Sequence, residues 1–403
     1  MIDEEEEIDL QRIFVDKVNL QGFKSIENLS IDFQKSLNIL IGKNGSGKSN
    51  LMEFLFQAIN FNRDDKIFYK NATLELVSAD NHSFVIELEK AHSKIAKEKF
   101  KDRIGLSERF FIDNELVLDN SAEDNIPRTF EFQKRKIDYQ NNLSFLLVSL
   151  GYEPLDPLFI KFNIPDKLEF IDNPGTLIGN IEDSFLYWDY PETLDFMSLA
   201  ISGLESFFEE HSSHLENSST AEIIENLEIE PEIIENLSVY TPIADMRFSN
   251  NVNLYRGNKG GSRSIIIENI KLEFKINGNW LPWSQLSDGT KRLFYIIAEV
   301  TNTNGLVLIE EPELGIHPHQ FNLLMDFLKE QSEHKQIIIS THSPKALDYL
   351  SEAELNSILI TYYDLKKGTQ IRHLTGKEIT KAKKYMKEVG FFSDYWLLSD
   401  LEQ

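Results

Sequence analysis

Cysteine is absent from the 403 residues of this chain. Its absence excludes disulfide bonds, thiolate zinc sites and cysteine nucleophiles, so any bound metal must use oxygen or imidazole ligands. Long hydrophobic runs are absent as well, because no stretch approaches the ~20 apolar residues that span a bilayer. The acidic start, Met1–Glu7, does not resemble a secretory signal or a transit peptide. We therefore expect a cytoplasmic protein with no membrane contact.

Basic residues are missing from one long stretch, Leu168–Met246, and the whole chain carries a net charge of −25. This balance disfavours uniform binding to nucleic acid or to an anionic membrane and favours protein partners. Acidic and aromatic side chains are interspersed in the stretch, with Glu205, Glu209 and Glu210 among the acids. We interpret it as a folded acidic surface that docks a partner protein or caps a basic groove, with a merely solvated surface as the alternative.

A glycine-rich turn between an apolar strand and a helix is the strongest pattern in the chain, over Leu37–Leu55. Gly42, Gly47, Lys48 and Ser49 match G-x-x-x-x-G-K-[ST]. In this motif backbone N–H groups surround phosphates, the lysine reaches the β- and γ-phosphate oxygens, and the serine binds Mg²⁺. The pattern predicts a nucleotide cradle formed by Gly42, Lys43, Asn44, Gly45, Ser46, Gly47, Lys48, Ser49 and Asn50.

Two further apolar strands end in polar residues that suit the same chemistry. Leu306–Ile309 is followed by Glu310 and Glu311, and Gln336–Ile339 ends shortly before His342. Because the carboxyl ends of parallel strands meet at one edge of a sheet, we expect these side chains near the glycine-rich turn. Glu310 can then hold Mg²⁺, and Glu311 can orient and deprotonate a water molecule.

Five segments together carry a family resemblance: GFKSIENLSIDF, IGKNGSGKS, LSDGTKRL, LVLIEEPELGIHP and IIISTHSP. In this order they resemble the ABC-type ATPases of the SMC, RecF and overcoming-lysogenization-defect kind, which are grouped broadly with AAA-family ATPases. The resemblance covers Ile13–Glu89 and roughly Ile265–Leu350. It leaves the middle and the end of the chain unassigned.

The resemblance implies a role for each matching segment. Lys48 belongs to the Walker A motif, Glu311 ends the Walker B motif as the catalytic glutamate, and His342 is the switch histidine that contacts the γ-phosphate. Glu313–His317 occupies the place of the D-loop. ATP and Mg²⁺ are the implied ligands, and the residues implied to bind the metal are Ser49 and Glu310.

A signature-like motif implies how two copies associate. In this family the signature of one head completes the ATP site of another, which implies a head-to-head homodimer or a higher homo-oligomer that closes on ATP. A helix that starts at the motif would present its backbone amides to the γ-phosphate. The motif consists of Leu286, Ser287, Asp288, Gly289 and Thr290.

The sequence departs from the family pattern at several positions. Glu310 stands where aspartate is commoner, so a longer carboxylate must reach the metal directly or through water. Asp288 stands where transporters have glycine, which adds negative charge near the nucleotide. His317 and His319 could suggest a separate metal cluster, but we interpret them as parts of a turn and a helix start. No residue identifies itself as the Q-loop glutamine, and the candidates are Gln133 and Gln140.

These patterns predict an α/β fold. We expect a P-loop ABC-type ATPase head with a mixed, mostly parallel, doubly wound sheet, an antiparallel N-terminal subdomain and a largely helical acidic insertion. The expected parts are an N-terminal ATPase lobe with Walker A (1–89), an insertion with a basic helical start and an acidic second half (90–246), a C-terminal lobe with the signature, Walker B and switch histidine (247–363), and a basic tail (364–403).

Two functions fit the resemblance. The first is an ATP-driven dimeric switch or sensor that controls a separate effector, a nuclease or toxin, as in the anti-phage ATPases of Septu-like, PARIS-like and retron-associated systems. The stretch after His342 is too short for the Toprim nuclease domain of related enzymes, so destructive chemistry is expected in a partner. The second is a RecF-like or SMC-like DNA-maintenance ATPase, which could contact DNA through Lys90–Arg103, Lys134–Lys136 and the tail lysines. A transporter ATPase is a third possibility, which no membrane segment supports.

Overall fold

The computed structural model describes residues 11–60, 69–91, 105–119, 129–132, 135–138, 143–161, 175–180, 185–188, 219–227, 229–249, 251–259, 262–399 and 401. Contacts within the chain divide it into two units, which we describe one at a time. Unit 1 contains Met1–Ile160, Thr303–Pro312 and Leu328–Gln403, and unit 2 contains Lys161–Asn302 and Glu313–Phe327. None of the helices in the described ranges combines the length and the apolar composition needed to cross a bilayer.

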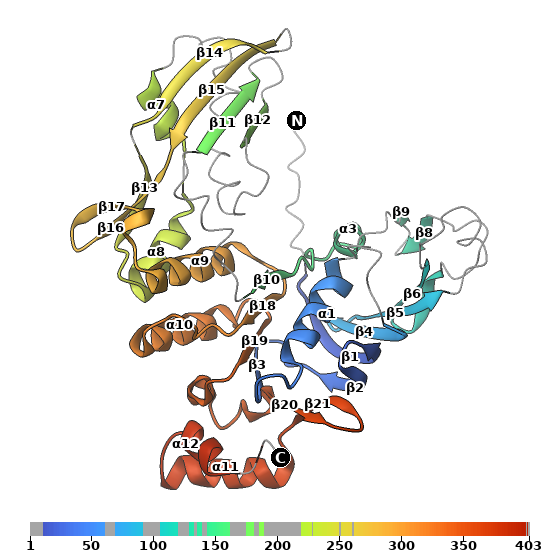
Figure 1. Ribbon diagram of the computed structural model, residues 1–403. Helices are drawn as coiled ribbons and strands as arrows, with labels where there is room; N and C mark the ends of the chain where they lie inside the picture. Colours follow the sequence, from blue (N-terminus) through green and yellow to red (C-terminus); the bar gives the residue numbers. More distant parts are fainter. Residues whose placement is uncertain are drawn as a thin grey trace. The chain divides into compact units, whose positions relative to one another are not determined.

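A twelve-stranded sheet forms the framework of unit 1 (Figure 1). Its strands, in chain order, are β1 Ile13–Phe23, β2 Ile26–Asp32, β3 Leu37–Ile41, β4 Asn71–Ser78, β5 Ser83–Ala91, β6 Gly105–Ile112, β7 Glu115–Asp119, β10 Leu158–Ile160, β18 Val307–Glu310, β19 Ile337–Thr341, β20 Ile358–Asp364 and β21 Gly368–His373. They lie side by side in the order β10-β18-β19-β3-β20-β21-β2-β1-β4-β5-β6-β7. A separate hairpin pairs β8 (Thr129–Phe132) with β9 (Arg135–Asp138).

The strands from β10 to β20 in this order run parallel to one another. β3 and β19 are buried along their whole length, because runs of Leu and Ile suit strands that are covered on both faces. The register places Glu310 beside Ser340 on β19, and it places Thr341 beside Ile41 on β3. Three strands therefore end at the same edge of the sheet. The α/β fold with parallel strands that the sequence predicts is confirmed.

The rest of the sheet is antiparallel, as predicted for the N-terminal subdomain. β1 carries a bulge between Val15 and Lys17. The buried side chain of Gln336 serves this bulge, because the Val15 N–H donates to Gln336 Oε1 at 2.8 Å and Gln336 Nε2 donates to the Val15 carbonyl at 2.8 Å. The same Nε2 also donates to the Gln34 carbonyl at 2.8 Å. The buried side-chain amide of Gln336, the residue before β19, is thus bonded to β1, and both its oxygen and its nitrogen have hydrogen-bond partners.

Helix α1 (Lys48–Asn60) buries one face against the sheet, with Leu51 and Leu55 fully enclosed. Its Phe54 ring makes edge contacts with Phe23 and Tyr69, at centroid distances of 5.7 and 5.9 Å. Helix α3 (Leu143–Ser149) adds two more buried leucines to the same core. The core of unit 1 therefore holds the start of α1 firmly against the parallel strands.

Unit 2 contains two small antiparallel sheets, β12-β11-β15-β14 and β13-β16-β17, whose strands are β11 Gly175–Asn180, β12 Phe185–Trp188, β13 Asp245–Phe248, β14 Asn253–Lys259, β15 Ser262–Ile270, β16 Leu272–Ile276 and β17 Asn279–Pro282. Its helical elements are α7 Thr220–Glu225, α8 Pro231–Tyr240, η1 Trp283–Gln285, α9 Asp288–Asn302 and the start of α10 Pro318–Gln331. Rings of Phe274, Trp283 and Phe294 pack together with centroids 5.0–5.7 Å apart. They fix the start of α9 on the second sheet.

The stretch 90–246, for which the sequence predicts mostly helix, contains α3, α7 and α8 among its described residues, but also the strands β6 to β13. The segment EIIENL occurs twice in the sequence. Glu222–Leu227 begins in α7 and continues two residues past its end, and Glu232–Leu237 lies within α8, which begins at Pro231. Several predicted features lie outside the described residues: Glu205, Glu209, Glu210, Gln133, Gln140, Lys134 and most of Lys90–Arg103.

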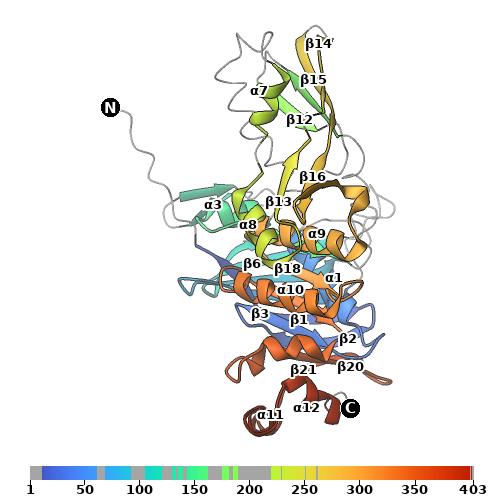
Figure 2. The same cartoon turned by 90° about the vertical axis from the view of Figure 1, so that its left-hand side faces the viewer.

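The C-terminal part of unit 1 contains two short helical turns, η2 (Pro344–Tyr349) and η3 (Leu355–Ser357), and two helices, α11 (Gly376–Glu388) and α12 (Phe392–Leu398). In both views α11 and α12 lie together beyond β20 and β21 (Figure 1 and Figure 2). Asp348 of η2 holds the start of α12, because its carboxylate accepts hydrogen bonds from the Ser393 N–H and Oγ, both at 2.8 Å. The tail is therefore anchored to the same unit as the parallel strands.

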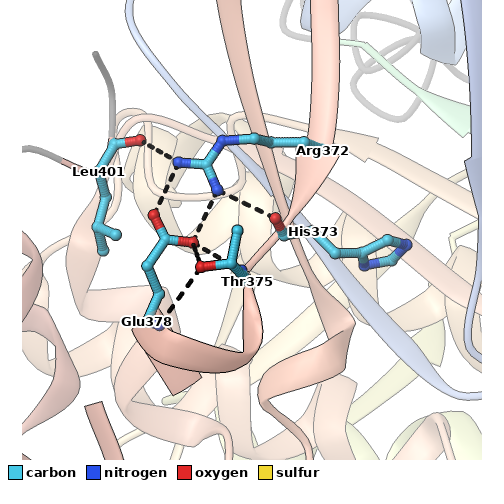
Figure 3. Close-up of polar contacts among 5 residues, drawn as sticks. All are labelled: Arg372, His373, Thr375, Glu378 and Leu401. Atoms are coloured by element: carbon cyan, nitrogen blue, oxygen red, sulfur yellow. Dashed lines mark hydrogen bonds and ion pairs between the residues drawn. The ribbon is translucent and has the colours of Figure 1, made fainter. Parts of the chain in front are cut away.

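Arg372 at the end of β21 anchors the tail a second time (Figure 3). Its guanidinium donates to both carboxylate oxygens of Glu378, at 2.9 and 3.0 Å, and to the Leu401 carbonyl at 3.0 Å. Glu378 and Thr375 also form a capping box at the start of α11. Burial raises the pKa of the Glu378 carboxyl, but hydrogen bonds from Arg372 and Thr375 lower it more, so its pKa lies below the ordinary value.

We expect Glu378→Gln to lower the free energy of unfolding by about 1 kcal/mol at neutral pH, because the hydrogen bonds from Arg372 lose their charged acceptor, whereas glutamine can keep its part in the capping box. A depressed carboxyl pKa contributes stability that is present above the unfolded-state pKa and is lost as the pH falls through the folded-state pKa. The difference between wild type and variant should therefore shrink in acid. Denaturant unfolding across a pH series measures it.

Glu388→Gln is the matched control, because Glu388 lies on the same helix with its side chain 61% exposed and 4.0 Å from Lys384. This substitution should change stability little at any pH. An equal loss in both variants, or a Glu378→Gln deficit that does not change with pH, would contradict the role given to the Arg372 contact.

Candidate functional site

The glycine-rich turn leaves β3 and enters α1 at Lys48. The second residue of β3 is a buried asparagine, Asn38, which accepts a hydrogen bond from the Gln34 N–H at 2.8 Å and donates to the carbonyls of Gln34 and Ser36. These bonds fix where β3 starts, and the first turn of α1 fixes where the loop ends. The N–H groups of that first turn have no carbonyl partner within the helix, which suits them to an anion.

Glycine is required at two positions of the turn by close packing. A Cβ atom at Gly42 would lie 2.0 Å from the Thr361 carbonyl oxygen of β20. A Cβ atom at Gly47, whose φ is +101°, would lie 2.1 Å from the Thr369 hydroxyl oxygen of β21. At Gly45, by contrast, a φ of +76° faces open space. The turn is therefore packed against β20 and β21 on one side and open at its tip, as a phosphate cradle requires.

Three predicted residues meet in unit 1. Lys48 Nζ donates to the carbonyls of Gly42 and Lys43, at 2.8 and 3.3 Å, and lies 3.2 and 3.1 Å from the Nδ1 and Nε2 atoms of His342. His342 Nε2 lies 2.9 Å from Glu311 Oε1. The imidazole ring of His342 thus contacts both the ammonium group of Lys48 and the carboxylate of Glu311. The parallel register brings these side chains from three separate segments into one contact chain.

Burial differs along this contact chain. Lys48 is buried, with 5% of its surface exposed, whereas the side chains of His342 and Glu311 are each 30% exposed. Thr341 Oγ1 accepts from the Ser343 N–H at 2.9 Å and so fixes the turn that carries His342. The side chains of Glu311 and His342 can therefore contact solvent or substrate, whereas Lys48 is buried.

Glu311 has an unusual backbone for a side chain of its size. Its φ of +46° lies in the left-handed region, and its N–H donates to the Ser340 carbonyl at 2.7 Å, which holds it there. A non-glycine residue in this region costs of order 1–3 kcal/mol and persists where the surrounding structure fixes it, often at functional sites. The strain aims the carboxylate of Glu311 at His342.

The two side chains predicted to bind a metal through oxygen lie on α1, which begins with Lys48, and on β18, which leads to Glu311. Ser49 is exposed in the first turn of α1, and Glu310 is the last residue of β18. In the part of the chain that the structure describes, no group of three or more histidine and acidic side chains could hold a metal alone. A hydroxyl and a carboxylate suit Mg²⁺, which commonly takes few protein ligands and completes its shell with phosphates and water. This donor set fits a nucleotide-bound Mg²⁺.

A polar cluster that the sequence analysis did not single out supports the turn. Ser25, between β1 and β2, shares a hydrogen bond of 2.7 Å with Thr369 and accepts one from Asn50 of α1. Its neighbour Lys24 has a φ of +49° and pairs with Glu53. The segment GFKSIENLSIDF carried part of the family resemblance, so a signal was present, but only the fold shows that its turn contacts α1 and β21.

The signature-like motif lies in unit 2, where it starts α9. Ser287 is the cap of this helix, because its Oγ accepts from the Thr290 N–H at 3.2 Å and lies 2.8 Å from the Thr290 hydroxyl. Asp288 occupies the first turn, where a negative charge is favourable to the helix dipole. A Cβ atom at Gly289 would lie 2.9 Å from the Gly315 carbonyl oxygen. The signature-like motif therefore packs closely on the turn predicted to be the D-loop.

The histidines of that turn have a local explanation. His317 Nδ1 accepts from the His319 N–H at 3.3 Å, and Pro318 is the first residue of α10. Proline is favoured at the first helical position, directly after a residue that caps the helix. His317 therefore has a capping role at the start of α10.

We expect Glu311→Gly to be about 1 kcal/mol more stable than Glu311→Ala, because glycine adopts a positive φ without the steric cost of a Cβ atom. Both variants lose the carboxylate and its contact with His342, so the comparison isolates the backbone. Denaturant unfolding of the two proteins measures the difference. The same pair at Glu333, an exposed residue near the end of α10 with no positive φ, should show the opposite order or no difference.

Comparison with known proteins places these motifs in a family. The family described as "AAA domain, putative AbiEii toxin, Type IV TA system" matches residues 37–348. A protein of Helicobacter pylori named "ATP/GTP phosphatase" is 21% identical over 354 residues, which cover 84% of this chain and 88% of that protein. The match therefore extends over both units.

Two other similar proteins match this chain over a shorter length or at a lower sequence identity. The "DNA replication and repair protein RecF" of Francisella tularensis is 28% identical over 109 residues, which cover 21% of this chain and 31% of RecF. The chain thus matches less than a third of RecF. The SMC head domain from Thermotoga maritima is 13% identical, with a TM-score of 0.45 over 90% of this chain and 99% of that structure.

The family match spans the glycine-rich turn, the signature-like motif, the acidic pair and His342, which are the segments whose geometry is described above. The chain belongs to the family described as "AAA domain, putative AbiEii toxin, Type IV TA system".

Proposed function

We propose that this chain hydrolyses ATP with Mg²⁺ and acts as a dimeric switch that controls a separate effector protein in anti-phage defence. The triphosphate binds at the turn from Gly42 to Ser49, and Ser49 and Glu310 are the protein ligands of the metal. Mg²⁺, when bound, neutralises charge on the phosphate oxygens. The signature segment Leu286–Thr290 of one copy completes the nucleotide site of another copy.

The observation that carries this proposal is the contact chain from Lys48 through His342 to Glu311. In this arrangement the buried lysine occupies two carbonyls of the turn, and phosphate oxygens are a stronger partner for the same ammonium group. Glu311 is placed to accept a proton from water, and His342 orients its carboxylate. A nucleotide that draws Lys48 away from His342 therefore changes the surroundings of His342, the residue that orients the base Glu311.

Two comparisons support the finer parts of the proposal. The Helicobacter pylori relative named "ATP/GTP phosphatase" extends over most of this chain, which supports nucleotide hydrolysis. The family description names a toxin and a type IV toxin–antitoxin system, which supports a connection with a toxic effector. A nucleotide-dependent dimer that controls an effector accounts for both nucleotide hydrolysis and the connection with a toxin.

A DNA-maintenance function is the second candidate. The match with RecF of Francisella tularensis favours it, and α11 carries a basic surface with Lys377, Lys381, Lys383, Lys384 and Lys387. The two functions differ in what the purified chain binds. ATP-dependent binding of labelled duplex DNA favours maintenance, whereas a stable complex with the product of a neighbouring nuclease or toxin gene favours the switch.

Lys48→Ala should abolish Mg²⁺-dependent ATP hydrolysis and weaken ATP binding, because the ammonium contact with the β- and γ-phosphates is lost. Phosphate release and binding of a fluorescent ATP analogue measure the two effects. Lys366→Ala is the matched control, since Lys366 is an exposed lysine in the turn between β20 and β21 of the same unit. Normal turnover by Lys48→Ala would show that the site is assigned wrongly.

Glu311→Gln should keep ATP bound and allow a dimer to accumulate, because it removes the base but preserves the size of the side chain and leaves Glu310 for the metal. Loss of a general base typically slows a reaction by about 10²–10⁴-fold. Analytical ultracentrifugation with and without ATP measures the dimer, and Glu333→Gln serves as the exposed control. If the species distribution of Glu311→Gln is the same with and without ATP, nucleotide does not control assembly.

A further inference from the structure

The helix α12 is apolar on two sides. Its inner side buries Phe392, Ser393 and Trp396 against the rest of unit 1. Its outer side exposes Leu397 and Leu398, which are 72% and 79% accessible. A helix that is hydrophobic around most of its circumference is normally covered on both sides. The outer side of α12 is therefore apolar and yet exposed to solvent.

The exposed apolar residues form a group, which we call the C-terminal patch: Val389, Phe391, Leu397 and Leu398. Leu397 and Leu398 end α12, and Phe391 and Val389 lie just before its first residue, Phe392. In the described residues, ten large hydrophobic side chains are strongly exposed, and four of them fall within this short stretch. Scattered exposed leucines are ordinary, but a clustered group rimmed by polar residues marks an interaction surface.

Lysines border the C-terminal patch. Lys345 Nζ lies 5.3 Å from the centre of the Phe391 ring. On α11, Lys377, Lys381 and Lys384 are exposed and follow one another at helical spacing, so they share one side of the helix, which ends beside Val389. The helices α11 and α12 together carry five lysines and three acids, Glu378, Glu388 and Asp394, and Lys384 lies 4.0 Å from Glu388. They are therefore net basic, although the chain as a whole carries a net charge of −25. A partner that covers the patch must bring acidic groups to it.

The helical structure and the charge of the C-terminal patch disfavour three other kinds of partner: a β-strand, a second copy of this chain and duplex DNA. It lies on helices, which present no row of unpaired backbone groups to which a strand could be added. A second copy packed through the same patch would bring two sets of lysines together, and like charges oppose that arrangement. Duplex DNA would meet the lysines but would gain nothing from four exposed apolar side chains. A helix with an apolar stripe and acidic flanks satisfies both parts of the surface.

We infer that the C-terminal patch is the docking site for an acidic amphipathic helix of a partner protein. The inference rests on the proposed function only in taking that partner to be the effector. α12 is attached by Lys345 and Asp348 to η2, which begins two residues after His342. Two side chains of η2 therefore connect the helix that carries the patch to the segment that follows His342, where a partner could respond to the state of the candidate site.

Fluorescence anisotropy with the full chain tests the inference. The probe is a labelled synthetic peptide of about three heptads with leucine at the apolar positions and glutamate beside them, and its counterpart carries lysine in place of glutamate. The acidic peptide should bind and the basic one should not. Raising the salt from about 50 to about 300 mM should weaken binding, because the charge contacts are exposed.

Matched variants locate the site. Leu397→Ser combined with Leu398→Ser should weaken binding at least about tenfold, as loss of central apolar contacts does. Leu365→Ser is the control, because Leu365 is 94% exposed in the turn between β20 and β21 and lies outside the patch. Lys381→Glu with Lys384→Glu should also weaken binding and reduce its salt dependence, whereas Lys366→Glu with Lys367→Glu should not.

Several results would overturn the inference. Equal binding of the two peptides, no binding of either, or equal losses for the Leu365 and Leu397 variants would each exclude a specific acidic-helix site. Binding of labelled duplex DNA that depends on the α11 lysines but not on Leu397 and Leu398 would assign the surface to nucleic acid. A dimer that Leu397→Ser with Leu398→Ser dissociates would assign it to a second copy. Lys48→Ala should still bind the peptide, so failure of the ATPase proposal and failure of this one can be told apart.

Discussion

The parallel register of β18, β19 and β3 is the constraint on which the candidate site depends. Glu310 pairs with Ser340, and Thr341 pairs with Ile41, so the residues that follow each strand emerge at one edge. A shift of one residue would turn each side chain to the other face of the sheet. Buried strands on both sides of β19 make such a shift costly, because it would move polar groups into the core and apolar groups out of it. The contact of His342 with both Lys48 and Glu311 is a consequence of this register.

The close approach of the glycine-rich turn to β20 and β21 is the second constraint. Backbone and hydroxyl atoms of these strands occupy the space where side chains at Gly42 and Gly47 would lie. Strand β20 pairs with β3 across more than three hundred residues of sequence, so the cradle is completed by the last strands of the chain. A phosphate cradle whose wall is formed by distant strands cannot fold as a local motif. Its shape depends on completion of the sheet, and a disturbance of β20 or β21 should reach the turn directly.

Sequence patterns predicted the elements of the site well, because each motif includes the strand or helix that carries it. The turn after β3, the acidic pair at the end of β18 and the α/β alternation follow from apolar periodicity and glycine spacing. The positive φ of Glu311 could not be predicted, since glutamate has no preference for that region and the Ser340 carbonyl imposes it. Nor could the contacts of Ser25 with Asn50 and Thr369, which join three separate segments. In each case a long-range contact overrides what the local sequence prefers.

The tail shows how the same contacts serve both the fold and an exposed surface. Asp348 holds α12 from the segment after His342, and Arg372 holds the end of the chain from β21, whose other end contacts the glycine-rich turn. The helices α11 and α12 are thus fixed by two elements that each start at the candidate site. A tail that only completed the core would have no reason to expose leucines on its outer side. Those leucines are 72% and 79% accessible, which is the observation behind our inference that a partner helix covers them.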